Sequence, residues 1–140
     1  MISQRKDLAE KIYQIGILQQ NFVLEKLRAV QLNSLQAHSL NYISKHPATI
    51  QRDLARYLGK QQATVTNILK VLEGKGFIYR EIPKANERQK NIYLTAEGEK
   101  MVLQVQAIFE DLGEQVDKAF SSEEKQQFQT FLKRVEEQLT

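Results

Sequence analysis

The spacing of apolar residues predicts helices along the first half of the chain. Four are expected, at about residues 3–27, 34–46, 50–58 and 61–73. The second begins after Asn33, a good N-cap residue with Gln36 three positions on, and ends before Pro47. Thr49 is expected to cap the third helix, and Gly59 to end it. The third and fourth helices would therefore be joined by a tight turn.

The pattern changes after residue 76. Residues 77–82 and 91–94 are rich in β-branched and aromatic types, and the polar segment 83–90 separates them, which predicts a hairpin. Helical spacing returns after Thr95, the expected cap of a helix that reaches about residue 119. Ser121 and Glu124 have the spacing of a capping box and predict a last helix. Its apolar face comprises Phe128, Phe131, Leu132, Val135 and Leu139.

These elements define a mainly α fold with a small β-hairpin. The order is helix, helix, helix-turn-helix, hairpin, helix, helix, and 140 residues fit a single domain. A helix-turn-helix followed directly by a two-stranded ribbon is typical of a winged helix-turn-helix. That fold can place its second helix in the major groove of duplex DNA, because the groove is about as wide as a helix.

The helix at 61–73 has the two faces that this role requires. Its inner face is apolar and comprises Val65, Ile68, Leu69 and Leu72. The outward positions are Ala63, Thr66, Asn67 and Lys70, and the N-terminal end carries Gln61, Gln62 and Thr64. Gln and Asn can bond adenine edges, Thr offers a hydroxyl and a methyl group, and Lys70 suits a phosphate. These seven residues are the predicted recognition-helix contacts.

The tip of the predicted hairpin is basic. Lys84, Arg88 and Lys90 are placed to reach the minor groove beside the recognition helix. The charge distribution agrees, although the net charge is only +3. Residues 60–96 carry seven Lys or Arg against three Asp or Glu, whereas residues 97–140 carry five against ten. A basic middle and an acidic tail indicate that one surface meets a polyanion.

Composition narrows the other function classes. The chain has no Cys and two His (His38 and His46), which disfavours redox sensing, a metal centre and nucleophilic catalysis, so no cofactor or enzymatic activity is expected. No stretch approaches the roughly 18 apolar residues of a membrane span, and no signal peptide is evident. The expected compartment is the cytoplasm.

Four segments between residues 54 and 98 together resemble the MarR family of bacterial regulators. They are Leu54–Gly59, Ala63–Asn67, Leu72–Ile78 and Leu94–Gly98. In the last two, Leu-Glu-Gly-Lys-Gly-Phe-Ile and Leu-Thr-Ala-Glu-Gly are similar to the family's segments on either side of the wing. One departure is Asn86-Glu87-Arg88, where the family wing usually has Asp-x-Arg. Arg88 keeps the arginine position, but Asn86 lacks the carboxylate that would orient it.

The resemblance implies a homodimer that binds a pseudo-palindromic operator, more often as a repressor. Residues 1–32 and 96–140 would be dimerisation helices, and residues 33–95 the DNA-binding lobe. The apolar stripes of the terminal helices, including Ile12 and Ile15, independently favour dimerisation because a small chain has little other core to cover them.

The sequence leaves open an effector site and one alternative function. Many family members respond to small phenolic or lipophilic effectors, and candidate pocket residues here are Tyr13, Phe22, His38 and Tyr42. Aromatic residues at helical spacing are more often core residues. The alternative function is a winged helix used as a protein-interaction module, which would favour an apolar or acidic recognition face.

Overall fold

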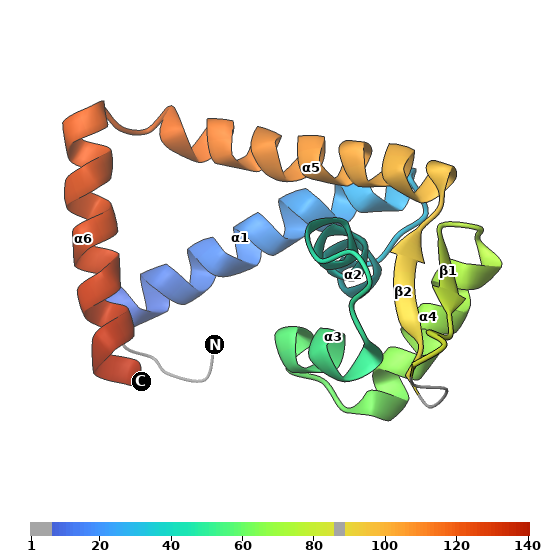
Figure 1. The fold of residues 1–140 in the computed structure, drawn as a ribbon. Coiled ribbons are helices and arrows are strands. Elements are labelled where there is room, and N and C mark those ends of the chain that lie inside the picture. Colours follow the sequence, from blue (N-terminus) through green and yellow to red (C-terminus); the bar gives the residue numbers. More distant parts are fainter. Residues whose placement is uncertain (1–6, 86–88) are drawn as a thin grey trace. The chain divides into compact units, whose positions relative to one another are not determined.

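The computed structural model describes residues 7–85 and 89–140 of the chain. The chain divides into two compact units, Met1–Ile108 and Phe109–Thr140. The predicted fold class is confirmed: the described residues form six helices and one antiparallel hairpin (Figure 1). The predicted division into dimerisation helices and a DNA-binding lobe concerns the assembled protein and stays a prediction.

The first unit holds all elements up to the first half of α5. Its helices and strands are α1 (Leu8–Ala29), α2 (Ser34–Lys45), α3 (Gln51–Leu58), α4 (Gln62–Gly74), β1 (Ile78–Glu81), β2 (Asn91–Leu94) and the start of α5 (Ala96–Asp117). The second unit holds the end of α5 and α6 (Ser122–Leu139). Strands β1 and β2 pair antiparallel, with Tyr79 opposite Tyr93 and Arg80 opposite Ile92.

Three of the predicted helix caps are confirmed. The Asn33 side chain accepts a bond from the Gln36 N–H at 2.8 Å, and the Asn33 N–H donates to the Gln36 side-chain oxygen at 3.1 Å. Ser121 and Glu124 form the same reciprocal box. The Thr95 hydroxyl accepts from the Gly98 N–H at 3.0 Å. These side chains satisfy N–H groups that a helix leaves unpaired in its first turn, so the helices begin where the sequence places them.

The prediction that Thr49 caps α3 is wrong. Ile50 is the N-cap residue, without a side-chain hydrogen bond, and Thr49 is buried. The backbone of Thr49 instead bridges to Ile92, whose N–H donates to the Thr49 carbonyl at 2.8 Å. This long-range bridge ties the segment before α3 to strand β2 and takes Thr49 out of the capping position.

The core of the first unit lies where α1, α2, α3, α4 and the hairpin meet. The largest fully buried side chains come from all of these elements: Leu27, Leu40, Ile43, Leu54, Leu69, Leu72 and Ile92. All four residues predicted for the inner face of α4 are buried. Burial of a leucine-sized side chain contributes about 1.5–3 kcal/mol, so this face holds α4 firmly on α2 and α3.

Helix α5 begins in direct contact with the turn between α4 and β1. The Thr95 N–H donates to the Phe77 carbonyl at 3.0 Å, and the Thr95 hydroxyl donates to the Gly76 carbonyl at 2.6 Å. A Cβ atom added at Gly98 would lie 2.0 Å from the Phe77 carbonyl oxygen, so only glycine fits there. The Thr-x-x-Gly spacing therefore fastens the start of α5 to the end of the α4 segment.

The second unit exposes most of its apolar side chains. None of the residues of α6 is buried, and Phe131 is 54% exposed. Phe120 and Phe128 contact each other with ring centroids 5.1 Å apart, and Lys125 pairs with Asp117 at 2.9 Å. These contacts fix the turn between α5 and α6 but leave the apolar stripe of α6 uncovered.

Candidate nucleic-acid interface

Helix α4 presents a polar outer face above its buried inner face. Six of the seven predicted contact residues are exposed: Gln61, Gln62, Ala63, Thr64, Asn67 and Lys70. Gln61 is the N-cap residue and makes no capping bond with its side chain. The amide and hydroxyl groups at the N-terminal end of α4 are thus available to an external partner. Their contact with DNA bases stays a prediction.

Thr66 differs from the other six because its hydroxyl is already engaged. It is half-buried, donates to the Gln62 carbonyl at 2.9 Å and accepts from Gln51 Nε2 at 2.7 Å. The same Gln51 nitrogen lies 3.1 Å from the Gln62 carbonyl oxygen. Gln51 therefore links the start of α3 to the first turn of α4 and positions the predicted recognition helix.

The hairpin is joined to the other end of α4. Arg80 on β1 donates to both carboxylate oxygens of Glu73, each at 3.3 Å, and its side chain is 19% exposed. Lys84 and Lys90 are exposed on the hairpin, as a DNA contact requires. Arg88, together with Asn86 and Glu87, lies outside the described residues.

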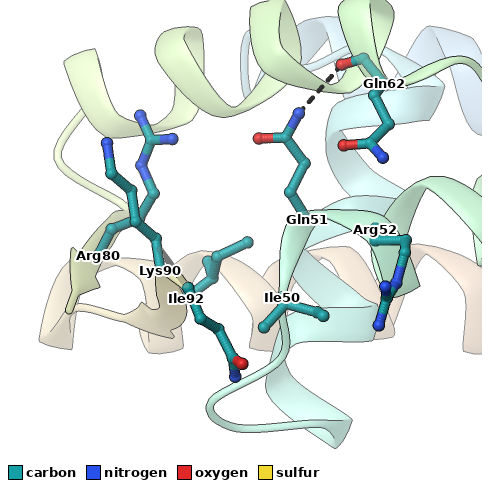
Figure 2. Close-up of a pocket in the computed structure, with 8 residues that line it drawn as sticks. Ile50, Gln51, Arg52, Gln62, Arg80, Lys90 and Ile92 are labelled. Carbon is teal, nitrogen blue, oxygen red and sulfur yellow. Dashed lines mark hydrogen bonds between the residues drawn. The ribbon is translucent and has the colours of Figure 1, made fainter. Parts of the chain in front are cut away.

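A hollow of about 510 Å³ lies between the starts of α3 and α4 and the hairpin (Figure 2). It is lined by Ile50, Gln51, Arg52, Gln62, Arg80, Gln89, Lys90 and Ile92. The figure places Arg80 and Lys90 on the hairpin side and Arg52 on the α3 side, with Gln51 between them. Three cations and no carboxylate are among these lining residues, so the hollow favours an anion.

Sequence reasoning missed Arg52 and Gln51. Both stand at the start of α3, the helix that precedes the predicted recognition helix. Gln51 bears on α4 through hydrogen bonds to residues 11 and 15 positions further along the chain, whereas Arg52 lines the hollow beside it. The signal available in the sequence was weak: an exposed basic residue in the first turn of a helix-turn-helix.

The four aromatic positions proposed for an effector pocket lie in different surroundings. Tyr13 is exposed on the first half of α1, whereas Phe22 lies nine residues on, about 13 Å along the helix, with Lys26 over its ring. Tyr42 stacks on both His46 and Tyr57, with ring centroids 4.1 and 4.6 Å apart. His38 is half-buried on α2. A binding role for these four residues stays a prediction.

A second hollow in the first unit, of about 480 Å³, has an aromatic lining. It lies between the end of α2, the hairpin and the first turns of α5, and it includes Tyr79 and Tyr93, whose rings stack 5.4 Å apart. Apolar side chains from α2 and α5 complete it, among them Ile43, Val102 and Leu103. Among the described residues that line it, Glu99 carries the sole charge.

Within residues 7–85 and 89–140, no group of three or more metal-ligating side chains is close enough to hold a metal ion. In the same residues, no helix has both the length and the apolar character needed to cross a membrane.

Comparison with known proteins places this geometry in a family. The model of the MarR family matches residues 32–90, which run from α2 to the residue before β2. The structure of MepR, a transcription regulator of the Staphylococcus aureus multidrug efflux pump MepA, is similar at 29% identity with a TM-score of 0.82, covering 96% of this chain and 99% of that one. A complex of S. aureus MepR with DNA gives 28% identity and a TM-score of 0.84, over the same shares of the two chains.

A third solved structure shows the family. It comes from Clostridium acetobutylicum, is assigned to the MarR family of transcriptional regulators, and is 32% identical with a TM-score of 0.73. The match covers 93% of this chain and 96% of that one. The chain therefore belongs to the MarR family of transcriptional regulators, as its four sequence segments indicate.

Proposed function

We propose that this protein regulates transcription by binding a specific duplex DNA sequence, with α4 as the recognition helix. The observation that carries the proposal is the division of α4 into two faces. Its apolar side chains are buried, whereas Gln61, Gln62, Thr64 and Asn67 are exposed at the end that enters the groove in helix-turn-helix proteins. The similar MepR has been solved in complex with DNA, which supports DNA as the partner of this chain.

The proposed functional form is a homodimer. Exposed apolar side chains occur on the first half of α1, including Leu8 and Leu18, and along α6, including Phe131 and Leu139. Water contact with so many large apolar groups is unfavourable, and a second copy of the chain offers the same surfaces in return. Two recognition helices related by a two-fold axis would read a pseudo-palindrome with half-sites about 34–36 Å apart. Repression is the mode of control that the family resemblance implies.

The test is selection of bound duplexes from a random pool, followed by titration of the selected duplex at several salt concentrations. Enrichment of a pseudo-palindrome with half-sites one helical turn apart is the expected result. A binding constant that falls steeply with salt would accompany it, because phosphate contacts release counterions. Failure to enrich any sequence, with weak binding at physiological salt, would instead favour a protein-interaction module.

We further propose that a small aromatic molecule controls DNA binding from the hollow that contains Tyr79 and Tyr93. A volume near 480 Å³ is in the range of small-molecule sites, and the hollow borders both the hairpin and α5. A bound molecule would thereby contact the wing and the helix that leaves it. Glu99 disfavours aromatic acids, whereas the two tyrosine rings can also bind a cation.

Calorimetric titration with tetraphenylphosphonium and with benzoate tests the chemistry of this hollow. We expect the cation to give heat of binding and the acid to give none. Glu99→Gln should weaken binding of the cation. Tyr13→Ala serves as the control, because Tyr13 belongs to the other set of candidate residues. Binding that depends on Tyr13 and not on Glu99 would return the effector site to α1.

A further inference from the structure

We propose that the hollow between α3, α4 and the hairpin holds the sugar–phosphate backbone of DNA, with Arg52 and Lys90 as its two phosphate-binding side chains. This inference rests on the proposed DNA-binding function and adds a contact outside both the recognition helix and the tip of the wing. The proposal is carried by two exposed cations on opposite sides of the hollow that no described carboxylate compensates.

The cations that line the hollow differ in what they already bind. Arg80 is held by Glu73 through two bonds of 3.3 Å, so much of its charge is compensated. Arg52 and Lys90 form no ion pair or hydrogen bond with any described residue, and both are exposed. An uncompensated cation on each side of a hollow attracts a polyanion that can lie across it.

The two sides of the hollow come from different elements, α3 and the hairpin. Arg52 stands in the first turn of α3, and Lys90 stands immediately before β2 on the hairpin (Figure 2). Between them, Gln51 and Gln62 join the first turns of α3 and α4 by a hydrogen bond of 3.1 Å. Contact with the DNA backbone in the hollow would therefore fix the start of α4 against the duplex. It would also set the register of the α4 side chains along the groove.

Polar amides add to the anion-binding character of the hollow. Gln62 presents a side-chain amide, and α3 and α4 both begin without a side-chain cap on their first N–H groups. The described α1, α2 and α6, by contrast, each begin with a side-chain cap. Phosphate oxygens accept hydrogen bonds from such neutral donors as well as from arginine and lysine. The main attraction for a phosphate nevertheless comes from the two uncompensated cations, Arg52 and Lys90.

The experiment measures the binding of the full chain to its selected duplex and to a scrambled duplex over a series of salt concentrations. Variants Arg52→Gln and Lys90→Gln remove one charge each, and Arg52→Lys keeps the charge. Lys100→Gln is the control, because it removes an exposed positive charge on α5, outside the hollow. Circular dichroism of each variant checks that it is folded.

We expect Arg52→Gln and Lys90→Gln to weaken binding to both duplexes by the same factor. Each should reduce the slope of log affinity against log salt by about 0.9, the share of one phosphate contact. Arg52→Lys should restore the slope. If Arg52→Gln and Lys90→Gln show the same affinity and salt slope as Lys100→Gln, this inference is overturned. The proposed function would then stand, provided that the wild-type protein still binds its duplex. Absence of DNA binding by the wild-type protein would overturn both.

A competition with inorganic phosphate at constant ionic strength distinguishes DNA backbone from a free anion. If the hollow binds DNA backbone, millimolar phosphate should displace the duplex no better than chloride does. Displacement by phosphate that Arg52→Gln abolishes, with an unchanged salt slope in that variant, would identify a small-anion site and overturn the assignment to DNA.

Discussion

Helices α4 and α6 carry similar amphipathic patterns but differ in what covers their apolar faces. Helix α4 buries Val65, Ile68, Leu69 and Leu72 against the first unit, with its polar face exposed. Helix α6 has an apolar stripe of comparable strength, yet none of its residues is buried. An amphipathic pattern therefore states that a helix needs an apolar partner. It does not state whether that partner belongs to the same chain or to a second copy.

The largest expected effect comes from the covered face. Leu69→Ala should lower the free energy of unfolding by about 2–5 kcal/mol, because it leaves a cavity at a fully buried position. Urea unfolding at a fixed protein concentration measures it. Leu103→Ala, at a position 66% exposed, is the control and should cost far less. Equal effects of the two substitutions would mean that α4 is not packed as described.

The uncovered face of α6 gives the next effect. Phe131→Lys places a charge in the proposed dimer interface and should weaken dimerisation by about 2 kcal/mol or more, roughly 30-fold in the dissociation constant. Sedimentation velocity over a concentration series measures this. Gln129→Lys adds the same charge about 160° away around the helix and should leave the dimer intact. Dimers of unchanged strength in the Phe131 variant would place the interface elsewhere.

The polar face of α4 should affect specificity more than stability. Asn67→Ala and Gln62→Ala are each expected to reduce discrimination between the selected and scrambled duplexes by about 1–3 kcal/mol, through loss of base contacts. Competition binding measures the ratio of the two affinities. Gln104→Ala, at an exposed position of α5, should leave the ratio unchanged. Equal losses on both duplexes would assign Asn67 and Gln62 to backbone contact.

A smaller effect tests the link between α3 and α4. Gln51→Leu and Thr66→Val should each lower the free energy of unfolding by about 0.5–1.5 kcal/mol, the usual net value of a hydrogen bond. Because the two side chains share one bond of 2.7 Å, the double variant should lose less than the sum of the single losses. Strictly additive losses in a double-mutant cycle would show that the bond contributes nothing to stability.

The smallest effect concerns the cap of α6. The Ser121 backbone N–H, followed by the Ser121 hydroxyl, lowers the pKa of the Glu124 carboxyl below its ordinary value of 4.5. Because the pKa is lowered in the folded state, ionised Glu124 stabilises the fold. This stabilisation is present above pH 4.5 and is lost as the pH falls through the lowered pKa. A carbon-13 NMR titration of Glu124 measures the shift. Ser121→Ala keeps the backbone N–H and removes only the hydroxyl, so it should return the pKa part of the way toward 4.5, whereas Ser122→Ala should leave it unchanged.

Local signals predicted much of the fold correctly. The capping boxes at Asn33 and Ser121, the change of period after residue 76 and the cap at Thr95 all depend on residues within a few positions of each other. Propensity and capping act over that range, so they can be found in the sequence. Thr49 shows the limit, because its pairing with Ile92 joins residues 43 positions apart.

In the candidate interface, too, local patterns predicted some features and long-range packing decided others. Helical periodicity alone separated the buried residues of α4 from exposed Gln62, Asn67 and Lys70, because 3.6 residues per turn determines which side chains share a face. The engagement of the Thr66 hydroxyl by Gln51 and the hollow between Arg52 and Lys90 were decided by tertiary structure. They arise where α3, α4 and the hairpin pack together, and no local pattern specifies which side chains meet across such a junction.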